Sequence, residues 1–117
     1  MKIQNIGGAT AIVEHDGKRM LFDPWMNEGI LNGSWYHWPK LNVAISELGR
    51  LDYIYISHIH EDHCAPDTIK HLNRDAEIII MDREPGVPNF IKRFLASNQF
   101  DFKKVHLIRP ETPTEIA

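Results

Sequence analysis

The chain has little cysteine, no long apolar run and no excess of basic charge. A single cysteine among 117 residues, Cys64, rules out an internal disulfide and agrees with a reducing compartment. No apolar stretch approaches the ~20 residues needed to cross a bilayer, and the amino terminus lacks the apolar segment of a secretion signal. We therefore expect a cytoplasmic protein that does not insert into a membrane.

Charge and chain length exclude further classes of protein. The 13 basic and 16 acidic residues are interspersed and give a formal net charge of -3, so no basic stripe predicts nucleic-acid binding. The sequence also lacks internal repeats and low-complexity segments. Because 117 residues suffice for one core but not for two, we expect residues 1–117 to form a single domain.

Turn signals and apolar patterns predict an α+β protein. Residues 9–14 and 19–22 flank a turn containing Asp16-Gly17, which indicates a β-hairpin. The apolar run 78–81 is typical of a strand covered on both faces. After the hairpin and a loop, the pattern alternates as strand, helix, strand, helix and strand over residues 53–57, 66–72, 77–81, 89–97 and 104–108.

Residues 24–39 form a predicted loop that is rich in aromatic side chains. Long structured loops in compact domains are often functional, so one interpretation is that Trp35 and His37 line a substrate pocket. The alternative is that the loop folds back and buries Trp25 and Trp35 in the core. The sequence leaves both interpretations open.

The most informative segment is Ser57-His-Ile-His-Glu-Asp-His63, in which four metal-binding side chains follow a predicted strand within six residues. With 7 histidines and 8 aspartates in the chain, chance would produce this pattern roughly two times in a thousand. Desolvating several imidazoles and a carboxylate is costly unless cations neutralise and bind them. The segment therefore predicts a metal site.

The spacing of these residues suggests two cations. His58 and His60 lie two residues apart, so on an extended segment their side chains point the same way and can bind one cation. Asp62 and His63 follow where the chain turns and can reach a second cation nearby. Two such metals would polarise a substrate oxygen and lower the pKa of a bridging water, which generates hydroxide for hydrolysis.

The same segment resembles the H-x-H-x-D-H signature of the metallo-β-lactamase superfamily, and Leu21-Phe-Asp-Pro24 is similar to that superfamily's first motif. The stretches Asp23-Pro-Trp25 and Gly33-Ser-Trp35 resemble most closely the branch that contains ascorbate-phosphate lactonases and sialic-acid-hydroxylase-like proteins. The resemblance implies an αββα sandwich of two similar halves, of which this chain matches the amino-terminal half.

The resemblance also implies roles for individual residues. His58 and His60 would bind the first metal and Asp62 and His63 the second, with Asp62 also transferring a proton in catalysis. Asp23 would support the site without touching a metal. The expected metal is zinc, with manganese or iron as alternatives.

In the superfamily, the remaining ligands are a histidine, an aspartate and a final histidine from the second half of the fold. We therefore expect an incomplete fold that either pairs with another copy or with a complementary half, or is a truncated product of a longer gene. The reason is physical, because an uncovered inner sheet face would expose more apolar area than soluble monomers tolerate.

Five further side chains are candidate ligands, each with a plainer interpretation. His71 is expected on the surface of a helix, and His106 in a strand as an ordinary core or edge residue. Cys64 is a good soft ligand, but a small buried residue at the start of a helix is the commoner case. Glu61 lies within the motif, and His37 in the aromatic loop is the one most expected to approach the metals.

Three functional hypotheses follow. The first is a metal-dependent hydrolase of a small lactone, phosphoester or similar ester, whose site is completed by another subunit or by further sequence. The second is a non-catalytic half-domain or interaction module with a vestigial metal site. The third is a mononuclear iron site formed by His58, His60 and a carboxylate, which would perform oxygen chemistry. Metal content and hydrolytic activity distinguish them.

Overall fold

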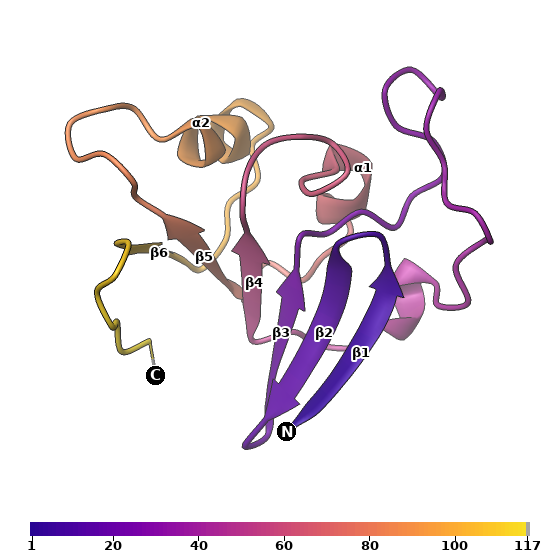
Figure 1. Ribbon diagram of the computed structural model, residues 1–117, viewed down its shortest axis with the longest axis horizontal. Coiled ribbons are helices and arrows are strands. Elements are labelled where there is room, and N and C mark those ends of the chain that lie inside the picture. Colours follow the sequence, from indigo (N-terminus) through magenta and orange to yellow (C-terminus); the bar gives the residue numbers. More distant parts are fainter. Residues whose placement is uncertain (117) are drawn as a thin grey trace.

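The computed structural model describes residues 1–116 and contains one mixed six-stranded sheet with helices near one end of its parallel strands (Figure 1). The strands follow one another across the sheet in the order β1-β2-β3-β4-β5-β6. The pairs from β1 to β3 are antiparallel, and those from β3 to β6 are parallel. This is the α+β class predicted from the sequence.

The antiparallel part consists of β1 (Lys2–Gly7), β2 (Thr10–His15) and β3 (Lys18–Phe22). The β2–β3 hairpin has the predicted turn, in which Asp16 and Gly17 have positive φ angles of 48° and 73°, as a type I′ turn requires. The sequence pattern missed β1. This strand lies at the edge of the sheet and most of its residues are exposed, so it has little apolar alternation.

The parallel part consists of β4 (Tyr53–Ile56), β5 (Glu77–Met81) and β6 (Lys104–Ile108), joined by α1 (Pro66–Ile69) and α2 (Phe90–Ser97). The predicted order is confirmed, although α1 ends at Ile69 and not at residue 72. A short 3-10 helix, η1 (Ile45–Glu47), precedes β4. Within residues 1–116, no helix has the length and apolar character needed to span a bilayer.

One face of the sheet forms the core with the helices. Leu21, Ile54 and Ile78 occupy one row across β3, β4 and β5, and all three are fully buried. The same cluster includes Ile69 from α1 and Leu95 from α2. Burial of this row against the helices fixes α1 and α2 on one side of the sheet.

The opposite face is also apolar and points away from α1 and α2. Phe22, Tyr55 and Ile79 form a neighbouring row on this face, with the rings of Phe22 and Tyr55 5.5 Å apart. Ile79 lies between Tyr55 and His106 of the neighbouring strands and is only 2% exposed, whereas Phe22 and Tyr55 are half-buried. As predicted, β5 is apolar on both faces.

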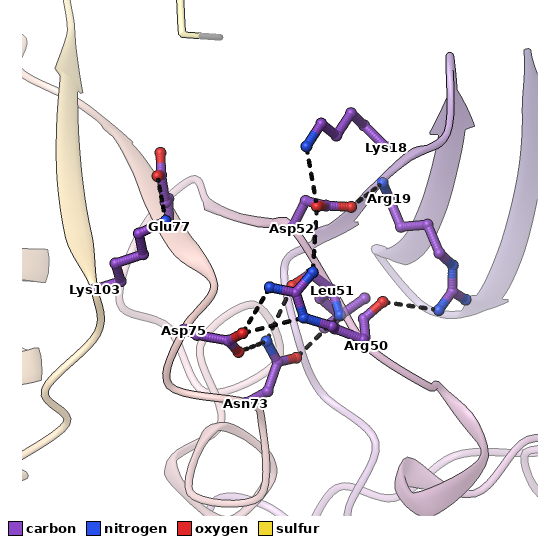
Figure 2. Close-up of polar contacts among 9 residues, drawn as sticks. All are labelled: Lys18, Arg19, Arg50, Leu51, Asp52, Asn73, Asp75, Glu77 and Lys103. Carbon is purple, nitrogen blue, oxygen red and sulfur yellow. Dashed lines mark hydrogen bonds and ion pairs between the residues drawn. The ribbon is translucent and has the colours of Figure 1, made fainter.

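Polar side chains fasten the amino-terminal ends of the parallel strands (Figure 2). Asp52 accepts a hydrogen bond from the backbone N–H of Arg19 at 2.9 Å, and this bond lowers the pKa of its carboxyl. Asp75 accepts from Asn73 at 2.6 Å and pairs with Arg50 at 2.6 Å, which lowers its pKa as well. These contacts connect the amino-terminal ends of the parallel strands, whereas the carboxyl ends of the strands lead into the loops.

Candidate metal centre

The loops after β3, β4 and β5 all lie near the carboxyl end of the parallel strands, in the upper part of Figure 1. Open sheets with parallel strands commonly bind ligands at this end. The histidine-rich segment is the loop between β4 and α1. The fold therefore places the predicted ligands at a usual ligand-binding position.

His58, His60 and His63 form a histidine cluster. The ring centroids of His58 and His63 lie 4.1 Å apart, and those of His58 and His60 lie 4.8 Å apart. Nε2 of His63 lies 3.3 Å from Oδ2 of Asp62. Burial and the neighbouring imidazoles of His63 and His60 lower the pKa of His58, which favours the neutral ring that metals bind.

The cluster is not a closed coordination sphere. Among residues 1–116, no three His, Cys, Asp or Glu side chains converge closely enough to hold a metal ion. Whether His58, His60, Asp62 and His63 bind metals therefore stays a prediction, to be weighed by the chemistry of the donors.

Asp23 organises the cluster from the end of β3. Its Oδ1 accepts a hydrogen bond from the backbone N–H of Ser57 at 2.7 Å. Its Oδ2 accepts from the Ser57 hydroxyl at 2.9 Å and lies 2.9 Å from Nδ1 of His63. Because a carboxylate only accepts, His63 must donate from Nδ1, and this tautomer places the lone pair of a neutral ring on Nε2.

The Ser57 hydroxyl extends this arrangement to His58. Its one proton is donated to Asp23, so it accepts from Nδ1 of His58, 2.8 Å away. Nε2 of His58 is then unprotonated as well. Metal-binding histidines usually donate a hydrogen bond from their other ring nitrogen in this way, so the donor chemistry of His58 and His63 fits a divalent metal.

The backbone of Asp23 is held in an unfavourable conformation, with a φ of 43°. Its N–H donates to the carbonyl of Tyr55 at 2.9 Å, and its carbonyl accepts from the hydroxyl of Thr10 at 2.7 Å. The same buried hydroxyl accepts from the backbone N–H of Trp25 at 3.0 Å. The sequence pattern did not single out Thr10, because a lone threonine in a strand carries no signal of this role.

The two tryptophans of the aromatic loop have different environments. Trp25 is 7% exposed and packs with Ile30 and Ala65, next to the histidine-rich segment. Trp35 is 52% exposed. The interpretation of these residues as core plugs is therefore confirmed for Trp25 and wrong for Trp35.

His37 does not join the histidine cluster. Its ring stacks on Trp25 with centroids 3.8 Å apart, and its Nε2 lies 3.0 Å from the Trp25 carbonyl oxygen. Together with Tyr36 and Lys40, it lines a separate cavity of about 400 Å³. The expected approach of His37 to the metal ligands is not seen, and a substrate-binding role for His37 and Trp35 stays a prediction.

Two side chains tie the aromatic loop to the histidine-rich segment and α1. Glu61, weighed above only as a ligand, accepts from the backbone N–H of Leu31 at 3.0 Å. Thr68, which the sequence pattern missed, is buried and accepts from the N–H groups of Met26 and Asn27 at 2.8 and 3.1 Å. These bonds fix the loop beside the site.

The remaining candidate ligands have structural surroundings of their own. His71 is exposed, as expected, but it lies in a turn after α1 and not within a helix. His106 in β6 contacts Glu77 in β5 at 2.5 Å, and this hydrogen bond lowers the pKa of Glu77. Cys64 is fully buried, and burial raises the pKa of its thiol to about 12. Its burial agrees with the plainer interpretation of Cys64 as a small buried residue near the start of α1.

Comparison with known families agrees with this geometry. A family model described as "Beta-lactamase superfamily domain" matches residues 2–117. The chain belongs to the beta-lactamase superfamily. The resemblance drawn from the histidine-rich segment and the aspartate before it is thereby confirmed.

Curated relatives in this superfamily are much longer than the matched region. A protein of Mycolicibacterium smegmatis, provisionally named a Rieske 2Fe-2S iron-sulfur protein, is 32% identical over 84 residues, which cover 70% of this chain and 16% of that protein. The cytidine monophosphate-N-acetylneuraminic acid hydroxylase of Sus scrofa is 36% identical over 75 residues, covering 63% of this chain and 15% of the hydroxylase. The matched region thus spans about a sixth of these relatives.

Two solved structures have the same fold. The isothiocyanate hydrolase from Delia radicum gut bacteria aligns with a TM-score of 0.72 and 21% identity, covering 97% of this chain and 44% of that one. A possible metal-dependent hydrolase from Veillonella parvula aligns with a TM-score of 0.65 and 19% identity, covering 91% and 40%. This chain corresponds to less than half of each neighbour, and both neighbours are named as hydrolases.

Proposed function

We propose that this chain supplies the metal-binding, amino-terminal half of a hydrolase that acts on a small ester, lactone or phosphoester. The observation that carries the proposal is the network from Asp23 through Ser57 to the histidine cluster. It leaves a lone pair on Nε2 of His58 and of His63, as metal ligands require, and the Asp62 carboxylate lies 3.3 Å from Nε2 of His63. Membership of the beta-lactamase superfamily and the hydrolase neighbours support it.

Each residue would have a defined part in the reaction. His58 and His60 would hold one divalent cation, and Asp62 and His63 a second, with zinc the expected metal and manganese or iron the alternatives. When bound, the metals supply a water whose pKa is low enough to give hydroxide near neutral pH. The partly exposed carboxylate of Asp62 would move a proton.

The remaining ligands would come from a second copy or a complementary half that covers the free apolar face of the sheet. Phe22, Tyr55 and Met81 are half-buried on that face and would pack against a facing sheet. Light scattering should then show association that increases with protein concentration. A monomer at every concentration would contradict this part of the proposal.

Hydrolysis assays test the proposed activity. After loading with zinc, the full chain should hydrolyse members of a panel of lactones, carboxylic esters and phosphodiesters, and EDTA should stop the reaction. His58→Ala and Asp62→Ala should abolish turnover, whereas His15→Ala, at an exposed histidine in the hairpin, should not. Protein that stays inert with zinc, manganese and iron would favour a non-catalytic module.

A second candidate is oxygen chemistry at a single iron. It is favoured by the 36% identity to a hydroxylase, because two histidines and one carboxylate are also the ligand set of non-haem iron sites. With an added electron donor such as ascorbate, iron-loaded protein would then consume oxygen, and zinc-loaded protein would not hydrolyse esters. Elemental analysis and an oxygen electrode distinguish the two candidates.

A further inference from the structure

A cleft of about 480 Å³ opens beside the histidine cluster. Ser57 and His58 form one end of it. Its walls come from residues 81–84, at and just after the end of β5, and residues 87–91, just before and at the start of α2. Pockets that bind small molecules have volumes of about 300–1,000 Å³. The cleft therefore has the size of a ligand site and begins at one of the predicted metal ligands.

The walls of the cleft are mainly apolar. Three of the side chains around the opening are large apolar groups that remain 42–64% exposed, namely Ile59, Val87 and Phe90. Exposed apolar side chains that gather around one opening, and are not scattered, mark a binding surface. The complete apolar lining is Ile59, Met81, Val87, Pro88, Phe90 and Ile91.

The side chains of Ser57 and Asn89 in the cleft are already paired, and the acidic side chains of the lining outnumber its one basic side chain, so the cleft does not form an anion site. The side chain of Asn89 accepts from the N–H groups of Ile91 and Lys92, which occupies the donors at the start of α2. A phosphate is bound by several free N–H donors or by clustered basic side chains. Here the lining has one basic side chain, Arg83, against the acidic Asp82 and Glu84.

We propose that this cleft binds the alkyl or aryl part of an uncharged ester, thioester or lactone and places its carbonyl group beside His58. This inference rests on the proposed hydrolase function and narrows its substrate class, because Asp82 and Glu84 outnumber Arg83 in the cleft and disfavour an anionic phosphoester. Phe90 and Val87 would select substrates by the length of their apolar group.

Binding in the presence of EDTA tests the cleft without any metal chemistry. The neutral fluorophore N-phenyl-1-naphthylamine would be bound to the full chain and displaced by methyl esters with acyl chains of four to ten carbons. Affinity should rise about fourfold with each methylene until the cleft is filled. Phe90→Ala and Val87→Asn should weaken binding of the longer esters by about tenfold and change binding of the four-carbon ester little.

Both substituted side chains are largely exposed, so the variants should fold, and thermal unfolding would check this. The matched control is Trp38→Ala, which removes an 86% exposed aromatic ring outside the cleft and should leave displacement unchanged. Equal affinity for short and long esters would overturn the proposal, as would unchanged binding in both cleft variants. Probe binding that falls with rising protein concentration would also overturn it, because a second copy would then occupy the cleft.

The result of the ester-binding test can be distinguished from the result of the hydrolysis assay. Chain-length-dependent binding in EDTA by protein that never hydrolyses an ester would support the cleft and reject the hydrolase. Zinc-dependent hydrolysis with the same kcat/KM for short and long acyl chains would support the hydrolase and reject the cleft.

Discussion

Replacing Asp23 by asparagine should reverse the direction of the hydrogen bonds around the histidine cluster and so change the tautomers of His58 and His63. The remaining oxygen must stay at the Oδ1 position to accept from the Ser57 N–H, 2.7 Å away, so the amide nitrogen takes the place of Oδ2. That nitrogen only donates, and it would donate to Nδ1 of His63 and to the Ser57 hydroxyl. The hydroxyl would then donate its own proton to Nδ1 of His58, and both rings would carry a proton on Nε2.

The size of the effect follows from counting hydrogen bonds. In the metal-free protein none is lost, so the free energy of unfolding should change by less than about 1 kcal/mol. To bind a metal through Nε2, each ring must return its proton to Nδ1 and lose one hydrogen bond worth about 1 kcal/mol. His58 and His63 are assigned to different cations, so each cation loses about 1 kcal/mol. Affinity at each site should therefore fall about fivefold, and the constant for loading both sites about 30-fold.

Two measurements check this prediction. Competition with a chromophoric chelator gives the zinc affinity, and nitrogen-detected NMR of the imidazoles gives their tautomers in metal-free protein. We expect Nδ1–H at His58 and His63 in the wild type and Nε2–H in Asp23→Asn. Asp16→Asn, in the exposed hairpin turn, is the matched control and should leave both readings unchanged. Wild-type zinc affinity together with wild-type tautomers in Asp23→Asn would refute the reasoning.

Three further predictions concern stability and reactivity. The pKa values of His58, Asp52 and Glu77 are lowered in the folded chain, so these groups stabilise it fully at pH values above their unfolded-state pKa and lose this effect as pH falls. The urea midpoint of unfolding should therefore decrease below pH 6.5 and again below pH 4.5. Equal midpoints at pH 7 and pH 4 would contradict this. Thr68→Val removes the acceptor of two backbone N–H groups and should lower the free energy of unfolding by about 2 kcal/mol. Thr68→Ser keeps the hydroxyl and should not lower it, and a loss below about 0.5 kcal/mol in Thr68→Val would show that these two hydrogen bonds do not stabilise the fold. The buried thiol of Cys64, whose pKa is about 12, should resist Ellman's reagent at pH 8 until urea unfolds the chain, so rapid labelling of the native protein would disprove its burial.

The sequence was sufficient to predict those parts of the structure that depend on residues close together in the chain. His58, His60, Asp62 and His63 lie within six positions and follow one strand, so a local pattern predicted their proximity. The run from Ile78 to Met81 is apolar without interruption, and this predicted a strand that is apolar on both faces.

Contacts between distant residues could not be predicted in the same way. Thr10 and Thr68 act by binding backbone groups of residues 23–27, and an isolated threonine gives no pattern that points to such a partner. His37 was expected near the metal ligands, but the loop folds back and its ring binds Trp25. These positions depend on the path of a long loop, which turn and strand signals do not determine.

The zinc content of the purified full chain tests the assignment of the histidine cluster as metal ligands most directly. After dialysis against zinc and then against metal-free buffer, elemental mass spectrometry should find at least one zinc ion per wild-type chain. The double variant His58→Ala, His63→Ala should retain none while unfolding at a similar temperature. Folded wild-type protein that retains no zinc, or a double variant that retains as much as the wild type, would contradict the assignment.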